Sequence, residues 1–167
     1  MGRLTDFGPT VLVPAAWSVT LAAHLGAVSR RTLFIALCVM DVLLVAFYVT
    51  ARAEMSGPVL GTWRRVLLVG LVATVAGTVD MALGTPDPVA LGTLFVWMLV
   101  PGVAYLLTGR EVPVSRSVYY AGGALSLVGA VGYGLAPLAG QVAVVAGLAA
   151  VGVGQTAGIV AAAVQNA

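Results

Sequence analysis

The sequence predicts an all-α integral membrane protein, built as a polytopic bundle of transmembrane helices. Of its 167 residues, 60% are hydrophobic and only 8% are charged, whereas soluble domains carry about 25% charged residues. The mean hydropathy is +1.07. Several apolar segments approach the roughly 20 residues that a helix needs to cross the hydrocarbon core. We therefore expect one transmembrane domain over residues 1–167 and no soluble domain.

The apolar segments are separated by short stretches that carry turn or charge signals. The first segment contains Pro14 and His24 and is followed at once by Arg30 and Arg31, which favours a retained span over a cleaved signal peptide. The break at Ala136-Pro137 is the weakest, so five spans are the alternative to six. The predicted spans cover residues 10–28, 33–49, 66–83, 89–107, 118–135 and 142–164.

The distribution of arginine predicts how the spans are oriented. With six spans, the two termini and the second and fourth connections share one side of the membrane, and the other side has only Arg30 and Arg31. Cytoplasmic segments carry the excess of positive charge, which places both termini in the cytoplasm of a multi-pass cell-membrane protein. The arginines on the cytoplasmic side are Arg3, Arg52, Arg64, Arg65, Arg110 and Arg116.

Small residues recur every four positions in the last two predicted spans. Stripes of this kind let two helix backbones approach closely, which drives helix association in lipid. We expect these spans to form a tight antiparallel pair, and the alternative is an interface between copies of the chain. The stripes are Gly122, Ser126, Ala130 and Gly134 in the fifth span, and Ala146, Ala150, Gly154, Gly158 and Ala162 in the sixth.

Asp41 is the most unusual residue, because no other charge lies within nine residues on either side of it. A carboxylate at the centre of a span costs about 3 kcal/mol on insertion scales. From the helical rise, we expect Ser18, Thr20 or Trp97 to lie at its depth and to donate hydrogen bonds to it. His24 lies nearer the outer end of its span and matches Asp80 in depth better than it matches Asp41.

Other polar residues point to a shared polar interior. Pro101 frees a backbone carbonyl in the fourth span, and Gln155 is a buried amide in the sixth. For Asp41, a neutral carboxyl that joins helices is the alternative to a functional site. For His24 and Asp80, the alternative to a functional role is a position near a helix end, close to the water at the membrane surface. The candidate ligand- or proton-binding residues are Asp41, His24, Asp80, Trp97, Thr20, Ser18 and Gln155.

Several chemistries are excluded by residues that the chain lacks. It has no lysine, so a Schiff base and a P-loop lysine are both excluded. One cysteine and one histidine cannot form a disulfide, a usual zinc site or a bis-histidine haem within one chain. We therefore expect no metal and no cofactor. The arginines flank apolar runs and so indicate topology, not nucleic-acid binding.

Three function classes remain open. The first is a binding or transport protein for a small hydrophobic or weakly polar ligand, with Asp41 as a protonatable anchor. The second is a structural or accessory subunit that docks a second copy or another membrane protein. The third is a membrane enzyme acting on a lipid or isoprenoid, with Asp41 as general acid and His24 or Asp80 as base. The lipid bilayer is an expected partner in all three.

Overall fold

The computed structural model describes residues 3–84 and 88–165, and these residues form helices joined by short turns, with no strand among them. Six of the helices are long and one is a single short turn. They are α1 (Arg3–His24), α2 (Arg30–Ala51), α3 (Gly57–Leu83), α4 (Pro88–Glu111), α5 (Arg116–Gly134), α6 (Ala136–Ala139) and α7 (Gln141–Gln165).

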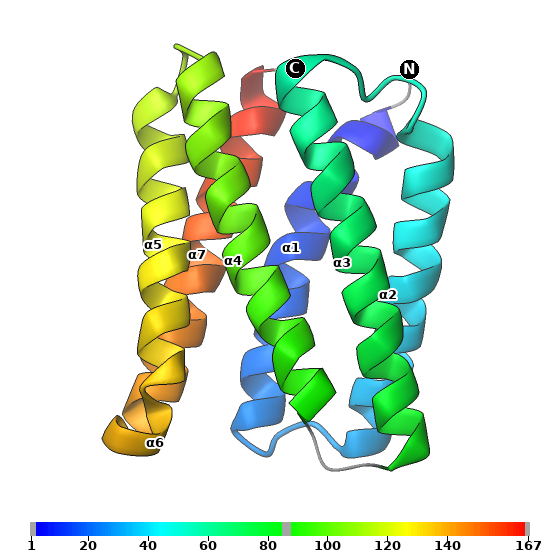
Figure 1. Cartoon of the computed structure of the whole chain (residues 1–167), viewed down its shortest axis with the longest axis vertical. Helices are drawn as coiled ribbons and strands as arrows, with labels where there is room; N and C mark the ends of the chain where they lie inside the picture. Colours follow the sequence, from blue (N-terminus) through cyan, green and yellow to red (C-terminus); the bar gives the residue numbers. More distant parts are fainter. Residues whose placement is uncertain (1–2, 85–87, 166–167) are drawn as a thin grey trace.

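The long helices lie side by side along one axis (Figure 1). α5 packs most extensively against α7, α4 lies between α3 and α5, and α1 packs against α7. α2 packs mainly against α3 and barely touches α1. The beginning of α1 and the end of α7 lie at the same end of the bundle. Among the long helices, α2 therefore packs least extensively against the rest of the bundle.

Helix ends differ from the predicted spans because caps, and not hydropathy, determine where a helix begins. The Ser29 hydroxyl accepts the Thr32 N–H at 3.1 Å and caps α2. Pro58 in the first turn lets α3 begin nine residues before the predicted span. At the other end of α3, Gly84 adopts φ 68°, a conformation that glycine tolerates. The predicted break at residues 84–88 lies partly outside the described residues.

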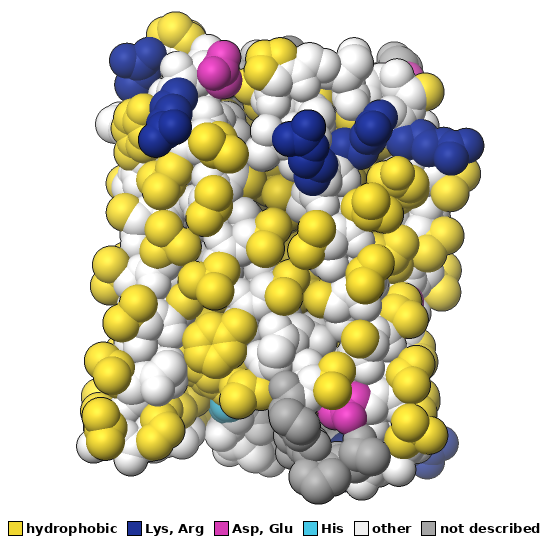
Figure 2. Space-filling model, in the orientation of Figure 1, with side chains coloured by type: hydrophobic (Ala, Val, Ile, Leu, Met, Phe, Trp, Pro, Cys, Tyr) yellow, Lys and Arg dark blue, Asp and Glu magenta, His cyan; other side chains and the backbone are white. Residues whose placement is uncertain are grey.

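The apolar character of the bundle matches the predicted class of protein. Four helices are long and apolar enough to cross a membrane, namely α2, α3, residues Val89–Glu111 of α4, and α7. Figure 2 shows apolar side chains over the height of the bundle and arginine side chains at its ends, with most of those visible at the end where α1 begins. The prediction of an all-helical bundle is confirmed for the described residues, and the length and composition of four helices suit a membrane span.

The predicted close pairing of the last two long helices is confirmed by the space around their glycines. A methyl group placed on Gly122 would lie 2.5 Å from the carbonyl oxygen of Gly154, and one on Gly129 would lie 2.6 Å from that of Gly147. From Gly122 to Gly129 on α5, the facing residue on α7 changes from Gly154 to Gly147, so the two helices are antiparallel. At these positions the two backbones are in direct contact, which only glycine permits.

The predicted stripes are correct only in part. On α7 the facing glycine is Gly147, and the neighbouring Ala146 is exposed. Gly158 and Gly134 face aromatic rings of α4, those of Tyr105 and Phe95. A strict four-residue spacing drifts around a helix that has 3.6 residues per turn, so one stripe cannot face the same neighbour along its whole length.

Candidate functional site

Gln155 joins four helices in the middle of the bundle. Its side-chain oxygen accepts a hydrogen bond from the Trp17 indole of α1 at 3.1 Å. Its amide nitrogen donates to the Trp97 carbonyl of α4 at 2.8 Å and to the Ser126 hydroxyl of α5 at 2.9 Å. Its own backbone carbonyl accepts the Tyr105 hydroxyl at 2.8 Å. Gln155 is only 4% exposed, so its polar atoms are hydrogen-bonded to groups of the protein instead of to water.

The position of Gln155 is explained by a proline on the opposite helix. Pro101 has no N–H, so the carbonyl of Trp97, four residues earlier, lacks its helical donor. The Gln155 amide supplies the missing donor, and Ser126 donates to the next carbonyl, that of Met98, at 2.8 Å. The predicted free carbonyl and the predicted buried amide are thus partners of each other.

A second group of polar contacts extends from Trp97 toward α2. The Trp97 indole N–H donates to the Thr74 hydroxyl at 2.9 Å, and that hydroxyl donates to the Gly70 carbonyl at 2.7 Å. The Trp97 ring lies against Gly70, where a methyl group would be 2.5 Å from the ring. Thr74 is followed one turn later by Thr78, whose hydroxyl is 2.9 Å from the Thr74 carbonyl.

Asp41 lies at the end of this string of polar groups. Its Oδ2 is hydrogen-bonded to the Thr78 hydroxyl at 2.7 Å, which joins α2 to α3. Its Oδ1 is buried and has no hydrogen-bond partner. Leaving a buried oxygen without a hydrogen-bond donor costs free energy, so this atom requires an explanation. This carboxyl, held by Thr78, is the candidate site.

The expected partners of Asp41 were wrong. The Ser18 hydroxyl donates to the Pro14 carbonyl at 2.8 Å and the Thr20 hydroxyl donates to the Ala16 carbonyl at 2.9 Å, both within α1. α1 packs against α7 and hardly touches α2, which removes both residues from the surroundings of Asp41. Depth along a span is not enough to predict a contact when the order of helices around the bundle is unknown.

The expected pairing of His24 with Asp80 was also wrong. The His24 ring bonds to the Thr20 carbonyl through Nδ1 at 2.9 Å and to the Tyr133 hydroxyl through Nε2 at 2.8 Å. It therefore joins α1 to α5. Asp80 is buried in α3 and 8% exposed. Since His24 and Asp41 have different partners on different helices, they do not form an acid–base pair. The other base of the enzyme hypothesis, Asp80, lies on α3 two residues after Thr78.

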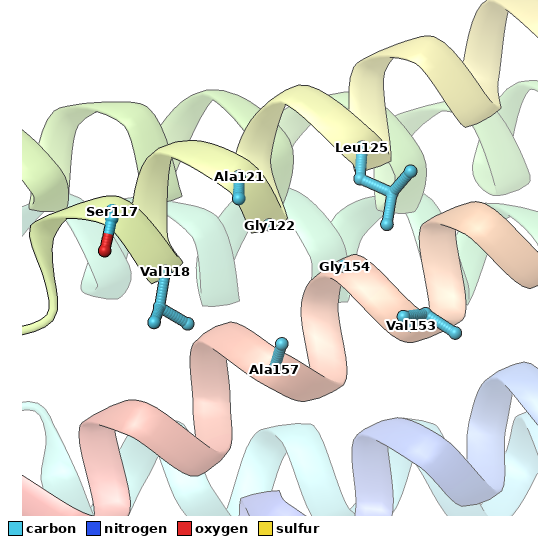
Figure 3. A pocket seen from close by; sticks show the side chains of 8 residues that line it. All are labelled: Ser117, Val118, Ala121, Gly122, Leu125, Val153, Gly154 and Ala157. Carbon is cyan, nitrogen blue, oxygen red and sulfur yellow. The ribbon is translucent and has the colours of Figure 1, made fainter.

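Asp41 lines neither of two hollows found among the described residues. Figure 3 shows the larger one, a shallow groove of about 340 Å³ between α5 and α7. Its walls are apolar apart from one serine: Ser117, Val118, Ala121, Gly122, Leu125, Val153, Gly154 and Ala157. The smaller one, of about 190 Å³, lies between the start of α3 and the end of α4 and includes Arg110 and Glu111.

Two residues of the site, Thr78 and Thr74, were not among the predicted site residues. Both belong to a stripe of small residues on α3 that begins at Gly70, and their four-residue spacing could have been recognised as a row of hydroxyls. Tyr133, the partner of His24, follows Ser126 by seven residues and shares its face of α5, and this spacing is its signal in the sequence. Trp97 and Gln155 do lie in the polar interior as predicted, and the backbone of Trp97 connects them.

The site offers one carboxyl and one hydroxyl, and no basic side chain of the described residues forms a hydrogen bond or ion pair with the carboxyl. This set can bind a proton or a hydrogen-bond donor. Comparison of the chain with protein-family models, with curated proteins and with solved structures found no match.

Proposed function

We propose that this chain is a six-span protein of the cell membrane that binds or transports a small hydrophobic or weakly polar molecule at Asp41, with both termini in the cytoplasm. The observation that carries the proposal is the buried Oδ1 of Asp41, which has no hydrogen-bond partner, while the buried amide of Gln155 is fully satisfied. Intramembrane carboxyls of this kind commonly mark ligand or proton sites.

The packing of α2 supports an access route to this site. α2 contacts α3 along its length but barely contacts α1, so the approach to Asp41 is bordered by fewer helices than the approach to Gln155. A molecule dissolved in the bilayer can reach a site beside α2 without crossing the α5–α7 pair, whose backbones are in contact.

Recovery of a bound molecule tests the proposal. Wild-type protein purified from native membranes in mild detergent would be extracted with solvent, and the extract analysed by mass spectrometry. We expect a small molecule that is bound by the wild type and lost from Asp41→Leu, because leucine offers no hydrogen-bonding group. Leucine favours membrane insertion, so the folded yield of the variant should not fall.

Thr50→Val is the matched control, since it removes a hydroxyl from the same helix that bonds only within α2. This variant should retain the molecule. Equal recovery from the wild type and Asp41→Leu, or no molecule from the wild type, would contradict the proposal.

A second function, that of an accessory subunit, is favoured by the outward face of α2. This helix is the least buried of the four candidate spans. In addition, the Asp41 carboxyl faces the small-residue stripe of α3, as a residue that joins helices would. Native mass spectrometry from mild detergent would reveal a defined oligomer or complex if this function applies, and a stable ligand-bound monomer would exclude it. The large apolar side chains exposed on α2 are Ile35, Val39, Val42, Leu43, Val45 and Val49.

A further inference from the structure

The hydroxyl of Thr78 has two acceptors but only one proton. Its oxygen lies 2.7 Å from Oδ2 of Asp41 and 2.9 Å from the carbonyl oxygen of Thr74. Both distances are normal for a hydrogen bond between oxygens. A threonine hydroxyl donates one hydrogen bond and accepts up to two. The protonation state of Asp41 therefore determines which of the two contacts the Thr78 proton serves.

An ionised Asp41 would leave this arrangement unsatisfied. Thr78 would have to donate to Oδ2, and Oδ1 would keep a share of the negative charge while buried without a donor. No described cation compensates it. The guanidinium of Arg30 donates to the Met81 carbonyl at 3.3 Å, and His24 is bonded to Tyr133. Burying an uncompensated charge costs several kcal/mol.

The surrounding titratable groups do not change this conclusion. On α2 itself, Cys38 and Tyr48 share the face of Asp41, and neither is a cation at neutral pH. On α3, Asp80 lies two residues beyond Thr78 and would add negative charge. Arg64 and Arg65 lie in the first third of α3, more than three helical turns before Thr78. α1, the remaining neighbour, makes little contact with α2.

A neutral Asp41 satisfies the same geometry fully. With its proton on Oδ2, the carboxyl donates to the Thr78 oxygen, and the Thr78 hydroxyl donates to the Thr74 carbonyl. We infer that Asp41 holds this proton in the resting protein and that Thr78 relays the hydrogen bond to the backbone of α3. Oδ1 then has the character of a carbonyl oxygen and accepts a hydrogen bond from the ligand.

This inference rests on the proposed binding function where it concerns the ligand, and it restricts the ligand's chemistry. A neutral carbonyl oxygen suits an uncharged molecule that carries an O–H or N–H donor, such as an alcohol or an amide in an apolar frame. Loss of the proton would require the Thr78 hydroxyl to turn from Thr74 to Asp41. Proton release and movement of this hydroxyl are therefore coupled.

Infrared spectroscopy of the full-length protein in bilayers tests the relay. The wild type should show the carbonyl band of a protonated carboxylic acid at neutral pH. This band should be absent from Asp41→Asn and retained in Asp80→Asn. In Thr78→Val the band should move to higher frequency, because the hydrogen bond that the carboxyl O–H donates to Thr78 is lost. Carboxylate bands of Asp41 in the wild type at neutral pH would overturn the inference.

Asparagine provides a second measurement, because it has the shape of a neutral aspartic acid and its amide N–H can donate to the Thr78 oxygen where the acid O–H would. Asp41→Asn should unfold at the same fraction of denaturing detergent as the wild type, and a large decrease would overturn the inference. The outcome is separable from that of the binding function. If the carboxylic-acid band is present but no molecule is bound, the relay stands and the binding function is rejected. If a molecule is bound but the band is absent, the binding function stands and the relay is rejected.

Discussion

Pro101 and Gln155 show how two residues that are each unfavourable in a membrane helix compensate one another. The proline deprives the Trp97 carbonyl of its helical donor, and the glutamine brings two amide donors into a region without water. Together they form a buried and fully bonded connection between α4 and α7. Asp41 has no such complete set of partners, and this difference separates a structural polar group from a candidate site.

A double-mutant cycle can measure this compensation. Gln155→Leu should destabilise the protein by about 2 kcal/mol, since interhelical hydrogen bonds average roughly 0.6 kcal/mol each in membrane proteins and three side-chain bonds are lost. In a Pro101→Ala background the backbone N–H is restored, so the same substitution should cost less. Unfolding in mixed detergent micelles gives both values. An equal cost in the two backgrounds would show that Pro101 and Gln155 are not coupled.

At the scale of the helices, glycine determines which neighbours can approach most closely. α5 contacts α7 through Gly122 and Gly129 and contacts α4 through Gly123, where a methyl group would lie 2.7 Å from the Gly102 carbonyl. The helix is thus held on two sides by backbone contact. α2 has no glycine. In the described part of the chain two of its side chains form hydrogen bonds to another helix, Arg30 to the Met81 carbonyl and Asp41 to the Thr78 hydroxyl, both on α3.

Two glycines three residues apart on α5 provide a matched test of this packing. Gly129→Ala should destabilise the bundle by about 1–3 kcal/mol, because the new methyl group would lie 2.6 Å from a backbone oxygen of α7. Gly132→Ala meets its nearest atom at 3.9 Å and should be neutral or stabilising. The free energy of unfolding in mixed micelles distinguishes them. Similar values for the two variants would refute the backbone contact.

For the whole molecule, six spans with both termini in the cytoplasm are a prediction that rests on the apolar segments and the arginine distribution. α1 and α5 lie beside the four most apolar helices and run along the same axis (Figure 1). If all six cross the membrane, the connections alternate between the two sides. The side with six arginines should then be cytoplasmic.

Cysteine labelling tests this topology in intact cells. In a Cys38→Ala background, single cysteines would replace Ser29, Ser56, Val114 or Gly140, and a membrane-impermeant maleimide would be applied from outside. We expect labelling at positions 29 and 140 and protection at 56 and 114, because each long helix reverses the side. Positions 114 and 140 with the same accessibility would show that α5 does not cross, and an inverted pattern would reverse the orientation.

The sequence alone determined the all-α class, the approximate helices and the close pair of α5 and α7, because these depend on composition and on residue spacing along a single helix. It also identified Asp41, Trp97 and Gln155 as unusual polar residues. Only the tertiary structure decided their partners. α1 packs beside α7 and not beside α2, so His24 binds Tyr133 and Asp41 binds Thr78. Helical periodicity fixes the face on which a side chain lies, but the order of helices around a bundle depends on the packing of all faces together.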